Sequence, residues 1–90
     1  MQRTNLKQDT ILLPDGRRLG YAEYGDADAP SVIYCHGFPS CRLEPGMVDI
    51  SGIRLVALDR PGYGLSDPSP GRRLVDWPAD VAAAADALGI

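Results

Sequence analysis

Two stretches of the sequence place residues able to do chemistry directly after an apolar run. They are "VIYCHGFPS" at residues 32–40 and "VALDRPGYGLSDP" at residues 56–68, and each apolar run ends in glycine and proline. A strand that ends this way leaves backbone N–H groups outside its own sheet. Fixed N–H donors stabilise the oxyanion that develops during acyl transfer, so one interpretation is half of an active site. The other is an ordinary turn that only ends a strand.

Cys35 and His36 are adjacent and suggest a nucleophile with its base. Neighbours in an extended strand point to opposite faces, so this pairing is not favoured, and Cys35 is interpreted as a buried, small, apolar residue. His36 is the only histidine, and Cys35 and Cys41 are the only cysteines, which is too few ligands for a zinc site at any recognised spacing. We therefore expect free thiols in a reducing compartment, and no metal.

Ser66 lies in "GLSDP", which has the spacing of the nucleophile-elbow pattern G-x-S-x-G except that Pro68 replaces the last glycine. An elbow serine needs a strand immediately before it and a helix immediately after it. Seven residues separate Ser66 from the end of the preceding apolar run. Ser66 is therefore predicted to be a loop residue, and no other G-x-S-x-G, G-x-C-x-G or G-x-D-x-G pattern occurs in the 90 residues.

The elements that would position these residues can be recognised from the spacing of apolar residues and from turn signals. Residues 10–13 and 17–25 flank the turn "PDG" and predict a β-hairpin. Residues 31–35 and 53–59 are typical of strands inside a parallel sheet. Residues 39–52 allow only a short crossover, in which Leu43, Met47 and Ile50 have helical spacing but Pro45 and Gly46 interrupt it, so one or two helical turns are expected.

The segment after a long loop at 60–73 predicts a helix that ends near Leu88. Its apolar stripe is Trp77, Val81, Ala84 and Leu88, with Pro78 in the first turn and Gly89 as the stop. The order of elements predicts an α/β fold. We expect residues 1–9 to be a flexible amino terminus and residues 10–90 to form one domain portion.

Composition excludes several classes of function. The hydrophobic content of 44% and charged content of 23% are typical of a folded globular chain. The net charge is -3 and no basic stripe is present, which argues against nucleic acid as a partner. The sequence has neither a signal-peptide pattern nor an apolar run long enough to span a membrane, so we predict a cytoplasmic protein without a membrane partner.

The combination of "HGFP" after one strand and "DRPGYGLSD" after the next resembles the first third of an α/β-hydrolase, over residues 10–90. The resemblance implies a partial α/β-hydrolase sheet, incomplete at the strand that carries the nucleophile. In that sheet the strand at 31–35 lies between the strand at 53–59 and the nucleophile strand. Without the latter, the strand at 31–35 is an open, apolar edge, and we expect the isolated chain either to self-associate through this edge or to unfold non-cooperatively.

The resemblance also assigns roles to individual residues. The backbone N–H of Phe38 is implied to be one oxyanion donor, with Phe38 and Pro39 lining the substrate site. Gly37 is expected to allow close approach and unusual dihedral angles, and Pro39 is expected to follow a cis bond as in relatives. The catalytic histidine of the family lies far downstream, so His36 is expected to shape the loop and to transfer no proton.

The second motif is implied to be structural. Asp59 is expected to accept backbone N–H bonds, and Arg60 to pair with Asp59 or with Asp67. Gly62 and Gly64 are expected to shape the same loop.

The function implied by the resemblance is hydrolysis of an ester or similar small acyl substrate by a serine-type parent enzyme, without a cofactor. The 90 residues alone lack nucleophile, acid and base, so we expect them to be inactive. Two alternatives remain open. The first is that the parent is an aspartate-nucleophile enzyme, such as an epoxide hydrolase or dehalogenase, since epoxide hydrolases also favour "HGFP". The second is that the chain is a non-catalytic module that binds a partner strand at an open sheet edge.

Overall fold

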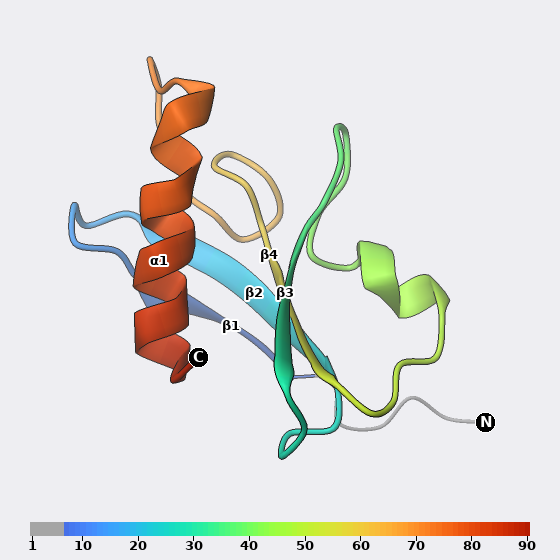
Figure 1. Cartoon of the computed structure of the whole chain (residues 1–90). Helices are drawn as coiled ribbons and strands as arrows, with labels where there is room; N and C mark the ends of the chain where they lie inside the picture. The colour runs from blue at the N-terminus through green and yellow to red at the C-terminus, as the bar shows by residue number, and fades with distance from the viewer. Residues whose placement is uncertain (1–6) are drawn as a thin grey trace.

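A computed structural model describes residues 7–90 and shows a four-stranded sheet with one α-helix (Figure 1). The strands are arranged in the order β1-β2-β4-β3. The elements are β1 (Lys7–Leu12), β2 (Arg18–Gly25), β3 (Ser31–Cys35), the 3-10 turn η1 (Glu44–Met47), β4 (Arg54–Leu58), the 3-10 turn η2 (Leu74–Asp76) and α1 (Trp77–Leu88). The predicted α/β sheet with a hairpin, a parallel strand pair and a carboxyl-terminal helix is confirmed.

The hairpin pairs β1 with β2 in antiparallel fashion, with Ile11 opposite Leu19. Its turn is closed by a 2.8 Å hydrogen bond from the N–H of Leu13 to the carbonyl of Arg17, and Gly16 adopts a φ of +91°, which a residue with a side chain rarely adopts. The strand begins at Lys7, earlier than predicted. The remainder of the predicted flexible segment, residues 1–6, lies outside the described residues.

Strand β4 lies inside the sheet, antiparallel to β2 and parallel to β3. Its residues 55–58 are buried, because β2 and β3 pair with its two edges and other elements cover both faces of the sheet. This explains why the sequence of β4 is apolar without alternation. Among residues 7–90, strand β3 has β4 on one side only, and it is the last strand of the sheet.

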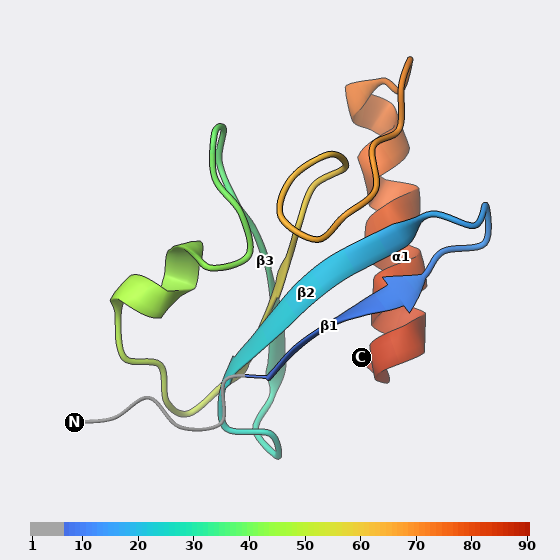
Figure 2. The same ribbon diagram turned by 180° about the vertical axis from the view of Figure 1, so that it is seen from behind.

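Helix α1 covers one face of the sheet, as the view from behind makes clear (Figure 2). Ala84 is buried against the sheet residues Leu19, Tyr21, Val56 and Leu58. The other predicted stripe residues pack against the same cluster and are partly buried: Trp77, Val81 and Leu88. The helix ends as predicted at Gly89, whose φ of +74° gives a left-handed cap.

Asp80 anchors α1 to the hairpin turn. The carboxylate is only 6% exposed, and it accepts hydrogen bonds of 3.2 and 2.9 Å from the two terminal nitrogens of Arg17. The Nη2 atom of Arg72 forms a second ion pair with it at 3.1 Å. Two guanidinium groups therefore compensate the charge that the helix buries.

The opposite face of the sheet is covered by the crossover. Tyr24 and Leu55 form a second apolar cluster here, against which Ile50 and Ile53 pack. The helical part of the crossover is a single 3-10 turn with Pro45 buried, whereas Met47 is 85% exposed. The helical spacing of Leu43, Met47 and Ile50 therefore does not form a core-facing stripe, because the turn is too short to bring all three to one side. Among residues 7–90, no helix has both the length and the apolar character needed to cross a membrane.

Candidate functional site

The loops that follow β3 and β4 meet beyond the carboxyl ends of the two parallel strands, where α/β sheets place their ligands. His36 joins them. Its ring is 1% exposed, and its Nε2 atom accepts a 3.0 Å hydrogen bond from the backbone N–H of Arg60. The Nε atom of Arg60 donates back to the carbonyl of His36 at 2.8 Å. The two motifs found in the sequence are therefore fixed to one another by a reciprocal pair of hydrogen bonds.

The second ring nitrogen of His36 is also engaged. Nδ1 lies 2.6 Å from the carbonyl of Gly37, and since Nε2 accepts a hydrogen bond, the neutral tautomer with its hydrogen on Nδ1 satisfies both contacts. Neither nitrogen is free to accept a proton from a substrate. This geometry suits the predicted loop-shaping role.

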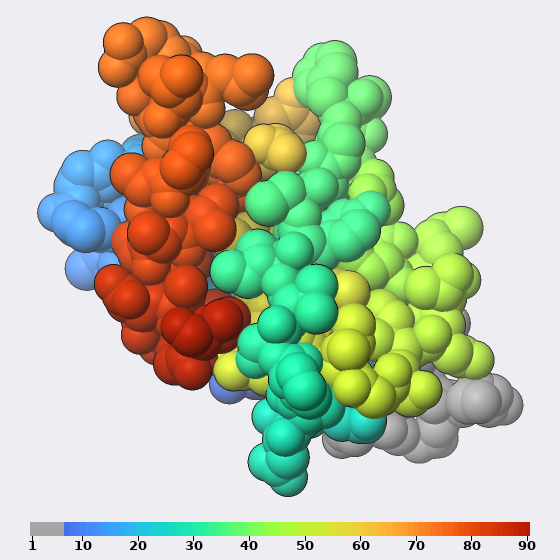
Figure 3. Space-filling view, viewed as in Figure 1, coloured from blue at the N-terminus to red at the C-terminus, as the bar shows by residue number. Residues whose placement is uncertain are grey.

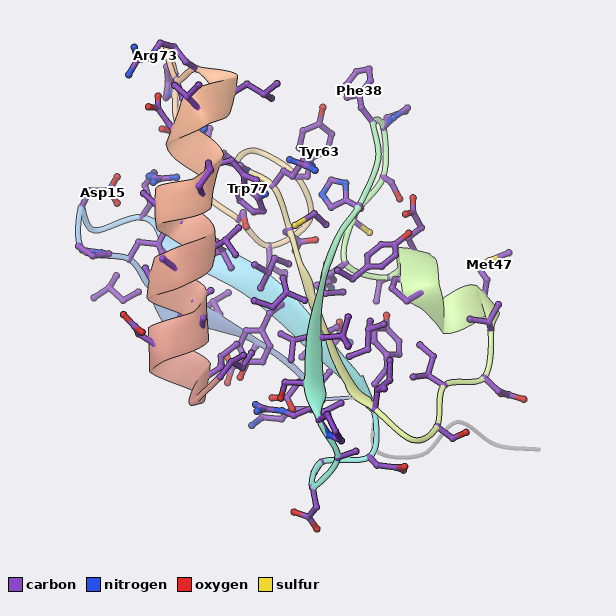
Figure 4. All side chains as sticks on the ribbon, in the orientation of Figure 1. Asp15, Phe38, Met47, Tyr63, Arg73 and Trp77 are labelled. Atoms are coloured by element: carbon purple, nitrogen blue, oxygen red, sulfur yellow. The ribbon has the colours of Figure 1, made fainter. Side chains whose placement is uncertain are left out.

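Phe38 stands at the tip of the loop after β3, with Tyr63 below it and Trp77 at the start of α1 (Figure 4). Its side chain is 83% exposed and meets Tyr63 edge to face, with 5.9 Å between the ring centroids. The Phe38–Pro39 peptide bond is cis, as the resemblance implied. Within residues 7–90 the backbone N–H of Phe38 donates to no other protein group. It is therefore available to a ligand.

Gly37 precedes this donor. Its φ is not positive. A Cβ atom added to Gly37 would meet nothing within 4 Å among the described residues. Packing inside residues 7–90 therefore does not require a glycine here.

Asp59 is the centre of the second loop. Its carboxylate is fully buried and accepts hydrogen bonds from the backbone N–H groups of Arg42 at 2.6 Å and Leu65 at 2.8 Å. The guanidinium group that pairs with it, at 3.2 Å, belongs to Arg42 in the crossover. Acceptance of backbone N–H bonds agrees with the sequence prediction, but nothing in the sequence around Arg42 indicated that it would supply the counter-charge.

Arg60 does not pair with either predicted carboxylate. Its guanidinium lies over the ring of Trp77, 5.1 Å from the centroid, while its Nε atom bonds the carbonyl of His36. Asp67 instead bonds the backbone N–H of Arg18 at 2.7 Å. The prediction for Arg60 was wrong because its guanidinium contacts the ring of Trp77 and the carbonyl of His36 instead. The carboxylate of Asp59 pairs with Arg42.

Ser66 and the glycines of the second motif maintain the loop. The hydroxyl of Ser66 donates to the carbonyl of Asp59 at 2.7 Å and accepts from the N–H of Gly20 at 2.9 Å, so it is a loop residue. Gly62 has a φ of +80° and Gly64 a φ of +52°. A Cβ atom on Gly64 would collide with the carboxylate of Asp59, so this position has no room for a side chain.

Comparison with known proteins gives the family. The sequence is 35% identical over 86 residues to a non-heme chloroperoxidase of Streptomyces lividans, covering 90% of this chain. It is 36% identical over 69 residues to bifunctional epoxide hydrolase 2 of Sus scrofa, covering 72% of this chain. The crystal structure of the haloalkane dehalogenase DbeA from Bradyrhizobium elkani USDA94 matches with a TM-score of 0.74 and 29% identity over 96% of this chain. The chain belongs to the α/β-hydrolase fold family.

The matches cover only part of each relative. The chain spans 31% of the chloroperoxidase, 12% of the bifunctional epoxide hydrolase and 31% of the dehalogenase. It corresponds to the amino-terminal portion of the α/β-hydrolase fold. No protein-family model matches the sequence.

Cys35 differs from its predicted environment in this α/β-hydrolase sheet. It is exposed instead of buried, and within residues 7–90 β3 is an edge strand with no neighbour on its outer side. Its Sγ atom accepts a hydrogen bond of 3.4 Å from Nε1 of Trp77. Cys35 and Cys41 are both free thiols, as predicted.

A hollow of about 220 Å³ adjoins the loop after β4. Its lining combines aromatic rings and guanidinium groups, and comprises Arg60, Pro61, Tyr63, Arg72, Arg73, Leu74 and Trp77. Tyr63, which lines the hollow, also contacts Phe38. A small molecule held in the hollow would meet aromatic rings and guanidinium groups.

Proposed function

We propose that this chain provides the oxyanion-binding half of an α/β-fold hydrolase that acts on an ester or a similar small acyl substrate. The observation that supports this proposal is the unpaired N–H of Phe38 on a loop whose base is fixed by His36 and Arg60. A preorganised donor of this kind stabilises a developing oxyanion by roughly 3 to 4 kcal/mol, because it needs no reorganisation as the charge forms.

The same geometry argues against a complete catalytic set within these 90 residues. Both ring nitrogens of His36 and the hydroxyl of Ser66 are engaged in hydrogen bonds that hold the loops. A nucleophile, an acid and a base would have to be supplied by residues outside the 90. The part of the reaction that this chain performs is to bind the carbonyl oxygen as it becomes negatively charged, through Phe38, with Phe38 and Pro39 bordering the substrate.

A second candidate is an aspartate-nucleophile hydrolase. It is supported by the similarity to proteins named epoxide hydrolase and haloalkane dehalogenase. The residue at the nucleophile elbow distinguishes the two candidates: serine supports the esterase and aspartate the alternative. We also propose a cytoplasmic location, which the two free thiols support.

The first test is an ester-hydrolysis assay with the purified 90-residue chain. We expect no turnover of an activated ester above that of a protein blank, and no difference between the chain and its Ser66→Ala or His36→Ala variants. Turnover that disappears in either variant would overturn the division of roles.

The second test uses a protein in which this chain continues through a nucleophile elbow. There, Phe38→Pro deletes the N–H donor and is expected to lower kcat by roughly 10² or more. Phe38→Ala is the matched control, because it removes the ring and keeps the N–H. Equal effects of the two changes would show that the ring matters and that the donor lies elsewhere.

A further inference from the structure

The loop after β3 holds its free N–H group in a defined direction, because hydrogen bonds fix the peptide groups on both sides of Gly37. The first peptide joins His36 to Gly37, and its carbonyl accepts the 2.8 Å hydrogen bond from Nε of Arg60. The second joins Gly37 to Phe38, and its carbonyl lies 2.6 Å from Nδ1 of His36. The carbonyl and the N–H of a trans peptide point in opposite directions, so this second bond determines where the N–H of Phe38 points.

Glu44 holds the same loop from the side of the crossover. It is the first residue of the 3-10 turn η1, and its carboxylate accepts a hydrogen bond from the hydroxyl of Tyr34. Hydrogen bonds from the side chains of Ser40 and Tyr34 lower the pKa of Glu44, and so does one from the backbone N–H of Gly37. Figure 3 shows the loop after β3 at the top of the molecule, with the crossover below it on the side away from α1.

The N–H of Gly37 belongs to the first of the two peptide groups. This peptide is therefore held at both ends, by Arg60 at its carbonyl and by Glu44 at its N–H. A glycine has no side chain to restrict its dihedral angles, so a peptide beside it can rotate unless both ends are fixed. Since Pro39 has no N–H, the N–H of Phe38 is the donor that this arrangement leaves for a ligand.

We propose that Glu44 is a positioning residue for the oxyanion donor, and that it holds the loop after β3 in the form in which the N–H of Phe38 faces the substrate. This inference rests on the proposed function, because it assigns the donor's orientation to a residue that does not touch the reacting atoms. A donor that is aligned in advance stabilises the developing charge without reorganisation, whereas a loop that samples several orientations has to be ordered during the reaction.

The crossover has anchors of its own, which separates the role of Glu44 from general support of the fold. Arg42 binds the buried carboxylate of Asp59 through its backbone N–H and its guanidinium. Pro45 is buried in the same segment. The hydrogen-bond partners of Glu44 lie instead in β3 and in the loop after it, so removal of its carboxylate releases the loop and leaves these anchors in place.

Nuclear magnetic resonance tests the inference without any activity. Phe38 is the only phenylalanine and Trp77 the only tryptophan in the 90 residues, so labelling both with ¹⁵N gives one backbone signal from Phe38 and one indole signal from Trp77. We expect a sharp Phe38 signal in the parent chain. Glu44→Ala should broaden or split it, because the loop then exchanges between orientations, and should leave the indole signal unchanged.

Two further variants make this comparison specific. Asp28→Ala removes the same charge from an exposed loop and should change neither signal. Glu44→Gln keeps one acceptor oxygen and should give a Phe38 signal between those of the parent and Glu44→Ala. A Phe38 signal that stays sharp and unshifted in Glu44→Ala would overturn the proposal. So would an equal change in the Trp77 signal, because Glu44 would then support the fold as a whole.

Kinetics provide a second test, in a protein in which this chain continues through a nucleophile elbow. Glu44→Ala should lower kcat by roughly tenfold and leave KM nearly unchanged, since the donor acts on the transition state more than on the bound substrate. Asp28→Ala should leave both constants unchanged. In a Phe38→Pro background, Glu44→Ala should have no further effect, because the donor that it positions is already gone. A further tenfold loss there would show that Glu44 acts by another route.

The outcomes separate this inference from the proposed function. If Phe38→Pro leaves kcat unchanged, the donor lies elsewhere and the proposed function fails. If Phe38→Pro lowers kcat and Glu44→Ala does not, the proposed function stands and the positioning role of Glu44 is wrong.

Discussion

Arg42 and Asp59 form a buried ion pair that joins the crossover to the loop after β4. The backbone N–H of Arg42 lies 2.6 Å from Oδ1 of Asp59, and its Nη1 atom lies 3.2 Å from Oδ2. The Asp59 side chain is fully buried and that of Arg42 is 11% exposed. One carboxylate therefore holds together the segment that precedes β4 in the chain and the segment that follows it.

Asp59→Asn is expected to destabilise the fold strongly. It would leave the Arg42 guanidinium with little solvent and no counter-charge, and breaking a buried pair by removing one partner costs roughly 3 to 5 kcal/mol. The measurement is the urea midpoint followed by the fluorescence of Trp77. Asp28→Asn is the control, because Asp28 is exposed in a loop and its midpoint should stay close to that of the parent. Equal midpoints for the two variants would contradict this account of Asp59.

His36 offers a test of the hydrogen bond that fixes the two motifs together. His36→Phe keeps an aromatic ring but leaves the N–H of Arg60 without its acceptor, at an expected cost of roughly 1 to 3 kcal/mol. His36→Gln retains an acceptor near the position of Nε2 and should lose less stability. If urea denaturation shows Phe to be tolerated better than Gln at this position, packing and not the hydrogen bond determines the choice of histidine.

The ion pair between Glu23 and Arg54 predicts a pH dependence of stability. The hydrogen bond from Arg54, with a smaller contribution from Lys7, lowers the pKa of Glu23 below its ordinary value. Because the folded-state pKa is depressed, the stabilisation is fully present above the unfolded value of about 4.3 and is lost as pH falls through the folded one.

Glu23→Gln isolates this contribution. The difference in urea midpoint between parent and variant should be largest near neutral pH and should shrink as the pH falls below about 4. Other carboxylates with lowered pKa values, such as Asp67, are present in both proteins and cancel in the comparison. A difference that stays constant with pH would show that Glu23 acts through packing and not through its charge.

The sequence was sufficient to predict the elements whose apolar pattern and turn residues agree. The hairpin around Gly16, the parallel strands and the helix ending at Gly89 follow from local signals, and the structure confirms them. The resemblance to α/β-hydrolases depended on two loop motifs that the fold brings together through His36 and Arg60. These parts were predictable because the relevant residues are close in sequence or part of a known pattern.

The parts that could not be predicted depend on contacts between distant residues. Arg42 is a single arginine in a crossover, and no local signal indicates that it would reach Asp59 in place of Arg60. The exposure of Cys35 follows from its position on an edge strand, and the residue type itself suggested burial. The spacing of apolar residues in a sequence indicates whether a segment is a helix or a strand. The Arg42–Asp59 pair and the exposure of Cys35 depend instead on which segments lie beside one another in the fold.

We expect substitution by alanine to have different effects on stability at Gly20 and at Gly37. A Cβ atom on Gly20 would lie 2.5 Å from Oδ2 of Asp59 and 2.7 Å from Cβ of Leu65, distances that real Cβ atoms do not adopt. Gly20→Ala should therefore displace the loop after β4, at an expected cost of roughly 1 to 3 kcal/mol, the usual range for overpacking.

Gly37→Ala should leave the stability of this chain nearly unchanged. Nothing among residues 7–90 lies within 4 Å of the added atom, and the φ of Gly37 is not positive. The two variants have the same change in composition, so their urea midpoints can be compared directly. If Gly37→Ala is tolerated here but lowers kcat in a protein that carries this chain together with a nucleophile elbow, then the glycine beside Phe38 provides room for the substrate. Equal destabilisation of the chain by both substitutions would show that the loop after β3 is packed more tightly than its open surroundings indicate.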